Sequence, residues 1–242
     1  MALEPFLAMT AAEIAGNPVL PPKIGWMACH FSPYGTGLSN LPRSLPPGSL
    51  LMVDDATPLR NHDPERIREQ LCRCAEAFRC SGILLDFQRP PDEQTAALAA
   101  FLSNSLPCPV AVSHLYSESA SCALCIPPVP PSEVPGRHFS QWPGRELWLE
   151  LSSEGEQITV TEDGAAVTFL PFWEERERDF FAENLLCHYR QEMQENAVVF
   201  TLYRTDEDAA ALLETAKSHG VTNTVGLYQE YFQFNPEAAP RR

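Results

Sequence analysis

Residues 81–90, SGILLDFQRP, constrain the fold more than any other stretch of the chain. The apolar part, residues 82–85, is too short for a helix and has no polar alternation, so it predicts a strand buried on both faces. Asp86 and Gln88 follow two residues apart and point to the same side at the carboxyl end of this strand. Ligands bind at that end in parallel barrels and open α/β sheets, although a terminal Asp can also simply cap the next turn.

Similar apolar runs recur along the chain and alternate with helical patterns. Strands are predicted at residues 24–31, 49–53, 82–88, 108–114, 122–126, 146–151, 197–203 and 224–228. Helices are predicted from Asp63-Pro64, at 92–105 and at 205–220, and residues 179–193 have the i, i+4 apolar spacing of an amphipathic helix. Residues 157–160 and 165–170 flank a Gly-containing turn and predict an antiparallel hairpin.

The order of these elements predicts an α/β fold, an irregular (β/α)8 TIM-like barrel. Some crossover helices are expected to be missing, near the start and around residues 122–131, where prolines are dense. The hairpin is an insertion. We expect one domain over residues 1–242, with residues 1–22 as a lead-in and 235–242 as a tail. An open doubly wound sheet is the competing fold, but no Gly-rich phosphate motif supports its nucleotide-binding forms.

Charge and cysteine usage exclude several classes of protein. The net charge of −15 over 242 residues argues against nucleic acid or an anionic membrane as partner, whereas an uncharged glycan is compatible with it. The first residues lack the pattern of a secretory signal or membrane span, so a cytoplasmic location is expected. The pairs Cys72-x-Cys74 and Cys122-x-x-Cys125 have no second pair at zinc spacing, and we expect neither a metal nor another cofactor.

The segment SGILLDFQ resembles the third-strand signature Asp-Gly-x-Asp-x-Asp-x-Glu of the chitinase-like family 18 glycoside hydrolases. Gly82, Asp86 and Phe87 match this pattern, whereas Ser81, Leu84 and above all Gln88 depart from it. The resemblance implies a barrel in which Asp86 orients the acetamido group of the substrate. Gln88 occupies the position of the general-acid Glu, and an amide cannot protonate a leaving oxygen. The resemblance therefore implies the fold together with a degenerate active site.

Three functional hypotheses follow. The favoured one is a barrel that binds a glycan or a protein without hydrolysis, through Asp86, Gln88 and other side chains at the strand ends. Four aromatic residues are candidates for the ligand wall: Tyr34, Tyr116, Tyr203 and Tyr228. His114 ends the predicted strand 108–114 and is a further candidate, although a single His there is more often structural.

The second hypothesis is a divergent glycoside hydrolase acting on polymers that contain N-acetylglucosamine. Its acid would come from another strand end, where the candidates are Asp54, Asp55, Glu150 and Glu230. Asp54 and Asp55 can equally cap the turn before Pro58, and Glu150 can equally lie on a solvated face. Two carboxylates facing one pocket, one with a raised pKa, would be the signature of such an enzyme. The third hypothesis is a structural barrel without a ligand.

Overall fold

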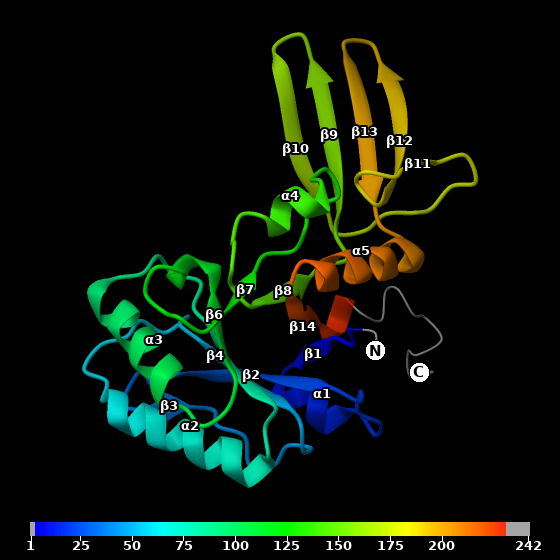
Figure 1. Cartoon of the computed structure of the whole chain (residues 1–242). Helices are drawn as coiled ribbons and strands as arrows, with labels where there is room; N and C mark the ends of the chain where they lie inside the picture. Colours follow the sequence, from blue (N-terminus) through cyan, green and yellow to red (C-terminus); the bar gives the residue numbers. More distant parts are fainter. Residues whose placement is uncertain (1–2, 231–242) are drawn as a thin grey trace.

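The structure is a computed structural model that describes residues 3–230. Eight parallel strands close into a barrel in the order β1-β14-β8-β7-β6-β5-β4-β2, and the pairing of β2 with β1 completes the circle (Figure 1). The strands are β1 (Phe6–Met9), β2 (Ile24–Phe31), β4 (Leu50–Asp54), β5 (Gly82–Asp86), β6 (Val110–Ser113), β7 (Ala123–Ile126), β8 (Leu147–Leu151) and β14 (Val221–Leu227). A short strand, β3 (Leu38–Ser39), pairs antiparallel with β2. The predicted TIM-like barrel is therefore confirmed.

Helices cover the barrel unevenly. They are α1 (Ala11–Gly16), α2 (Pro64–Phe78), α3 (Glu93–Ser105), the 3₁₀ turn η1 (His114–Tyr116), α4 (Pro135–Phe139) and α5 (Asp206–Ser218). Residues 32–49, between β2 and β4, contain no helix, as expected from their Pro and Gly content. The proline-rich connection after β7 does carry the short α4, because proline is tolerated in a first helical turn. None of the helices within residues 3–230 is long and apolar enough to cross a membrane.

Apolar side chains fill the barrel interior. Its inner cluster consists of Phe6, Ala8, Leu50, Met52, Leu84, Ala111, Ala123, Cys125, Trp148 and Val225. Gly82 is required at the start of β5, because a Cβ there would lie 2.9 Å from Cη2 of Trp148 and 3.0 Å from the carbonyl oxygen of Pro109. A larger cluster packs between the outer side of the strands and the helices. Side chains thus fill the interior of the barrel, so a site can form only at the carboxyl ends of the strands.

A second, antiparallel sheet is inserted between β8 and α5 and projects from the barrel (Figure 1). It contains β9 (Gly155–Thr161), β10 (Gly164–Leu170), β11 (Phe180–Ala182), β12 (Cys187–Gln194) and β13 (Ala197–Tyr203), in the order β10-β9-β13-β12-β11. The predicted hairpin at 157–160 and 165–170 corresponds to β9 and β10. The insertion is larger than predicted, since it recruits three further strands.

Two predictions about residues 179–203 are wrong. Residues 179–193 form β11 and β12 rather than a helix, because Tyr189 and Met193 pair across to β13 and Leu186 takes a left-handed conformation (φ 51°) that ends the turn between the strands. Residues 197–203 form β13, which pairs with β9 and β12 and not with the barrel. The eighth barrel strand is instead β1.

The N-terminal segment also differs from the prediction. Residues 1–22 were expected to be a lead-in, but Phe6–Met9 is the first barrel strand, fully buried between β2 and β14. The short helix α1 follows it, capped by Thr10 and Glu13. The strand that carries SGILLDFQ is consequently the fourth of the barrel and not the third. The expected tail, residues 235–242, lies outside the described residues.

Polar contacts fasten the inserted sheet to the barrel. The guanidinium of Arg204 donates to the carbonyl oxygens of Val129 and Pro130 after β7, and to those of Leu185 and Leu186 before β12. On the other side, His188 Nδ1 lies 2.7 Å from Oδ2 of Asp208 at the start of α5. Trp173 donates its indole N–H to the carbonyl oxygen of Ser153 at 2.8 Å. These contacts attach the inserted sheet to the connection after β7, to the start of α5 and to the segment just after β8.

Candidate functional site

Acidic side chains gather where the barrel strands end. Asp86 ends β5, Glu150 lies near the end of β8, and Glu230 follows β14 by three residues. Side chains alternate between the two faces of a strand, and Leu84 and Trp148 belong to the inner cluster of the barrel. Asp86 and Glu150, each two residues further on, therefore point into the mouth of the barrel.

The barrel mouth contains a cavity of about 280 Å³. Apolar residues of β1, β4, β5 and β14 form part of its lining: Ala8, Met52, Leu84 and Val225. Polar residues form another part: Asp86, Gln88, Glu150, Ser152, Glu154 and Glu230. The volume is near the lower end for sites that bind small molecules. Four carboxyl groups and one carboxamide thus surround a space that can take a small polar ligand.

Asp86 and Gln88 are in direct contact. The side-chain amide Nε2 of Gln88 donates a hydrogen bond to Oδ1 of Asp86. Burial raises the pKa of Asp86, the hydrogen bond from Gln88 opposes that shift, and the nearby charges of Asp54 and Asp55 add to it. Gln88 accordingly favours the ionised form of Asp86, and the two side chains present a carboxylate and an amide to the cavity.

Glu150 is the acid with the most perturbed environment in the mouth. Burial, reinforced by the negative charge of Asp86, raises its pKa to about 7. Its Oε1 lies 3.8 Å from Sγ of Cys125, a buried inner-barrel residue. Glu150 is therefore partly protonated near neutral pH while it lines the same cavity as Asp86. The alternative prediction was a solvated face, but this face of β8 is the inside of the barrel.

Asp54 and Asp55 mainly hold turns. Asp55 is 2% exposed, and its two carboxylate oxygens accept from the backbone N–H groups of Gln88 at 2.8 Å and Arg89 at 3.1 Å. Asp54 accepts from the backbone N–H of Ala56 at 2.9 Å. Neither residue is among those that line the cavity. Asp55 still acts on the site indirectly, because it fixes the backbone that carries the Gln88 side chain.

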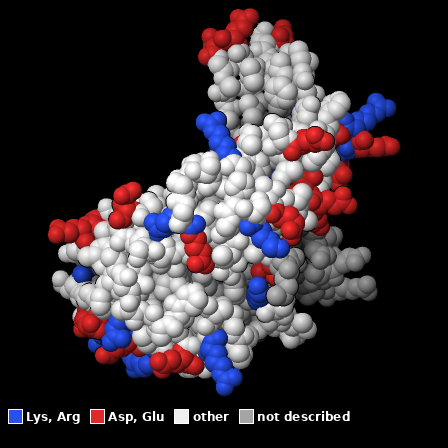
Figure 2. Space-filling model, in the orientation of Figure 1, with Lys and Arg blue, Asp and Glu red and all other residues white. Residues whose placement is uncertain are grey.

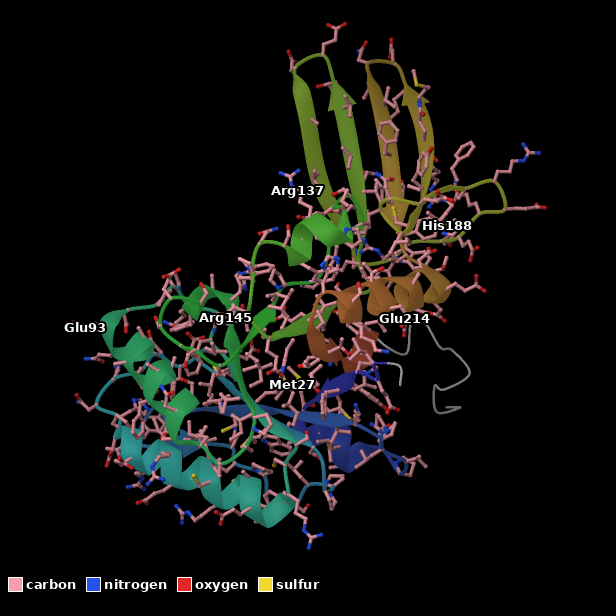
Figure 3. All side chains as sticks on the ribbon, in the orientation of Figure 1. Met27, Glu93, Arg137, Arg145, His188 and Glu214 are labelled. Carbon is pink, nitrogen blue, oxygen red and sulfur yellow. The ribbon has the colours of Figure 1, made fainter. Side chains whose placement is uncertain are left out.

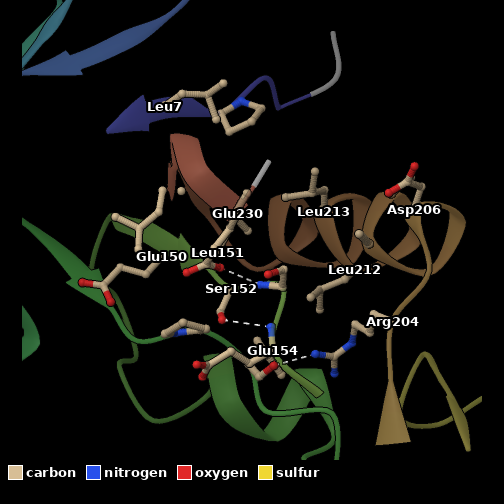
Figure 4. A pocket seen from close by; sticks show the side chains of 18 residues that line it. Leu7, Glu150, Leu151, Ser152, Glu154, Arg204, Asp206, Leu212, Leu213 and Glu230 are labelled. Atoms are coloured by element: carbon tan, nitrogen blue, oxygen red, sulfur yellow. Dashed lines mark hydrogen bonds between the residues drawn. The ribbon is translucent and has the colours of Figure 1, made fainter. Parts of the chain in front are cut away.

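Glu230 joins the ends of two strands and lies between two cavities. Its Oε2 accepts from the backbone N–H of Ser153 at 2.8 Å. A second cavity of about 290 Å³ adjoins the mouth beside α5 and shares Glu150, Glu154 and Glu230 with it (Figure 4). Five leucines line this second cavity, and two of them, Leu151 and Leu227, also line the mouth: Leu7, Leu151, Leu212, Leu213 and Leu227. Ser152 and Glu154 were not predicted, although their position just after β8 could have indicated them.

The structure does not bring the four candidate tyrosines to the cavity. Tyr34 is 98% exposed in the loop after β2, and Tyr116 is fully buried with its hydroxyl 3.3 Å from the carbonyl oxygen of Arg89. Tyr203 is buried in the inserted sheet, stacked 4.4 Å from Trp173. Tyr228 is 7% exposed and donates to Oδ1 of Asn17 at 2.8 Å. Each sits near a strand end, but none of the four is among the residues that line the cavity.

His114 is also directed away from the mouth. It begins η1, and its ring lies 6.2 Å from that of Trp142 in an edge-on contact. Burial, together with the nearby His138, lowers its pKa. Within residues 3–230, no group of three His, Cys, Asp or Glu side chains is arranged to hold a metal ion. The cysteines of both short pairs are free thiols.

The fold of this chain resembles that of several solved structures, although its sequence as a whole does not resemble that of a known family. No family model and no curated protein sequence matches the chain. Solved structures do match. A chitinase from Chromobacterium violaceum superposes with a TM-score of 0.56 at 10% identity, covering 99% of this chain and 100% of that one. A GH18 chitinase from Cycas revoluta, crystallised with (GlcNAc)4, gives 0.56 at 10% identity over 93% and 94% of the chains.

The spore cortex-lytic enzyme SleL of Bacillus cereus is also similar, with a TM-score of 0.53 and 10% identity over 93% of this chain and 70% of that one. At this identity the likeness concerns the fold. The chain has a TIM-barrel fold similar to that of these GH18 chitinases, with an inserted antiparallel sheet before its last barrel strand.

Proposed function

We propose that the barrel mouth binds an oligosaccharide containing N-acetylglucosamine and does not hydrolyse it by the family 18 mechanism. The observation that carries this proposal is the hydrogen bond from the Gln88 amide to Asp86 at the cavity wall. A carboxylate and an amide are suited to the hydroxyl and acetamido groups of such a sugar. The Cycas revoluta chitinase, which has a similar fold, was crystallised with (GlcNAc)4.

The loss of hydrolysis follows from the chemistry of Gln88. General acid catalysis requires a group that releases a proton to the leaving oxygen, and it contributes about 10² to 10⁴ in rate. A carboxamide has no such proton. Asp86 alone can orient an acetamido group but cannot replace the acid. The site therefore retains recognition chemistry without the proton donor that the family places beside it.

Thermal unfolding of the full chain with N-acetylglucosamine oligomers and peptidoglycan fragments tests binding. A ligand at about 100 times its dissociation constant should stabilise the protein by about 2.7 kcal/mol. Asp86→Ala should abolish the shift in melting temperature, whereas Asp163→Ala, an exposed acid in the turn between β9 and β10, should leave it intact. No shift with any sugar would contradict the proposal and favour a protein-binding or purely structural barrel.

A divergent hydrolase is the second candidate, and the pKa of Glu150 supports it. Glu150, with a pKa of about 7, and the ionisable Asp86 line one cavity. In glycosidases such a pair divides the work: the protonated member is the general acid and the ionised member stabilises the transition state. In this case Glu150 would donate the proton. Release of reducing ends from chito-oligosaccharides by the wild type, lost in Glu150→Gln and retained in Glu154→Gln, would establish it. Binding without turnover leaves the first candidate standing.

A further inference from the structure

One face of the inserted sheet is apolar and exposed. The cross-strand registers align Val167, Ile158 and Phe200 in one row, and Val160, Val198 and Met193 in the next row toward the tip. We call these six residues the apolar sheet face. Val167 is 54% exposed and Met193 is 74% exposed. Gln191 and Ala165 complete the two rows, so neither row contains a charged side chain.

The opposite face is partly covered by the chain itself. Residues 171–179 run across it, where Trp173 stacks on Tyr203 and the carbonyl oxygen of Glu174 accepts from Arg190 at 3.1 Å. Arg176 pairs with Glu192 at 3.2 Å. Val199, which points to this side, is only 4% exposed. Within the described part of the chain, residues 171–179 therefore cover this face over β12 and β13, whereas Ala166 and Thr168 of β10 are exposed on it.

We propose that the apolar sheet face is the contact surface of a homodimer, in which a second copy packs the same face against it in antiparallel orientation about a two-fold axis. A two-fold contact uses the same patch on both copies, and an uncharged apolar patch is complementary to itself. Two sheets packed in this way form a β-sandwich with a dry layer about 10 Å thick. The barrels would then lie at opposite ends of the sandwich.

The distribution of charge selects the antiparallel orientation. Acidic residues occupy the turns at the tip of the sheet: Glu162, Asp163 and Glu195. Arg137 of α4 is exposed at the barrel end of the inserted sheet (Figure 3). Figure 2 shows the projecting sheet as a white surface between the acidic tip and the charged residues of the base. An antiparallel dimer brings the tip of each copy toward Arg137 of the other, whereas a parallel one would bring the acidic tips together.

The size of the face is consistent with a reversible dimer. The whole four-stranded side of the sheet that contains these six residues spans about 20 Å by about 25 Å, or about 500 Å² per copy. The two copies together would bury on the order of 1,000 Å², which is near the lower bound for a specific interface. Association is therefore expected to be weak and reversible. A patch of this area is as large as the largest found on typical monomers.

Sedimentation equilibrium of the full chain tests the dimer. Between about 1 and about 300 µM the mean mass should rise from that of the 26.9 kDa monomer toward twice that value. Val167→Glu should keep the protein monomeric throughout. The matched control is Thr168→Glu, which adds the same charge to the next residue of β10 but on the opposite face, and should dimerise as the wild type does. Equal behaviour of these two variants, or a wild type that stays monomeric at 300 µM, would overturn the proposal.

A charge exchange tests the orientation. Arg137→Glu should weaken the dimer several-fold, and adding Glu162→Arg and Asp163→Arg should restore it, because the swapped charges meet only across an antiparallel contact. Circular dichroism and melting temperature confirm that each variant remains folded. If the combined variant associates no better than Arg137→Glu alone, the antiparallel arrangement is wrong.

Discussion

The side-chain amide of Gln88 donates a hydrogen bond to Oδ1 of Asp86, the inward-facing carboxyl at the end of β5. The backbone N–H of Gln88 is in turn held by the buried carboxylate of Asp55. One residue is thus fixed at both its backbone and its side chain by two different acids. The candidate site is built on a short, tightly held connection and not on a mobile loop.

Gln88→Glu should place a second carboxyl against Asp86. Two carboxyls in contact cannot both ionise easily, so they should share a proton near neutral pH. If the rest of the site retains the family geometry, hydrolysis of chito-oligosaccharides should rise above that of the wild type, by at most about 10² to 10⁴. The measurement is release of reducing ends, with Gln94→Glu on the exposed start of α3 as control. Complete inactivity would count against a recently lost chitinase site.

Glu150→Gln should change how stability depends on pH. The folded protein keeps a proton on Glu150 up to a pKa of about 7, whereas the unfolded chain releases it above the ordinary value of 4.5. The free energy of unfolding of the wild type therefore falls as pH rises between these two values and levels off above them. The variant lacks this loss, and its stability relative to the wild type should increase by up to about 3 kcal/mol between pH 4.5 and pH 8.

Urea titrations at several pH values measure that difference for Glu150. Glu154→Gln is the matched control, because Glu154 lines the same cavity but is exposed. A difference between Glu150→Gln and the wild type that stays constant from pH 4.5 to pH 8 would show that Glu150 titrates normally.

Asp55→Asn should destabilise the protein more than Asp54→Asn. The buried Asp55 accepts two backbone N–H groups, and the variant turns an NH₂ group toward one of these donors, which should cost about 2 to 3 kcal/mol. Asp54 accepts a single N–H in a more exposed turn. Chemical denaturation of both variants decides the matter. Equal losses of unfolding free energy in the two variants would mean that the hydrogen bonds from Gln88 and Arg89 to Asp55 add no extra stability.

Asp208→Ala should cost more stability than Thr205→Ala. Both remove half of the capping box of α5, a loss of about 1 kcal/mol. Asp208 additionally binds Nδ1 of His188 in β12 at 2.7 Å, and losing that link should cost about 1 kcal/mol more. A double-mutant cycle with His188→Ala isolates the shared term. If the losses of unfolding free energy in Asp208→Ala and His188→Ala simply add in the double variant, the link between the sheet and α5 is not stabilising.

The barrel could be predicted from the sequence because most of its strands are uninterrupted apolar runs between turn residues. The run at 24–31 matches β2, and Asp63 caps α2 as its spacing indicates. β1 was missed because its four residues, FLAM, are too few to carry a periodic signal and become a strand only through pairing with β14 and β2. The pairing of β1 with β14, which lies more than 200 residues away, produces no pattern in the local sequence of β1.

The inserted sheet and the site show the same limit. The i, i+4 spacing of Phe181, Leu185, Tyr189 and Met193 is typical of a helix, and only the pairing of β12 with β13 makes strands of this segment. Four residues predicted from their strand-end positions do line one cavity, while their role in binding or catalysis stays a prediction: Asp86, Gln88, Glu150 and Glu230. Strand-end position failed for the tyrosines, because proximity to a strand end does not determine which way a side chain points.

The pairing of β1 with β14 also determines when this protein can fold. The barrel closes only when Phe6–Met9 pairs with residues 225–227, which lie more than 200 positions later in the chain. Until then the sheet has free edges. At ribosomal rates of 5 to 20 residues per second, the first strand must wait for about 10 to 40 s before its second neighbour is synthesised. During that interval the growing barrel is an open sheet with two unpaired edges, the state in which such a chain most needs protection from aggregation.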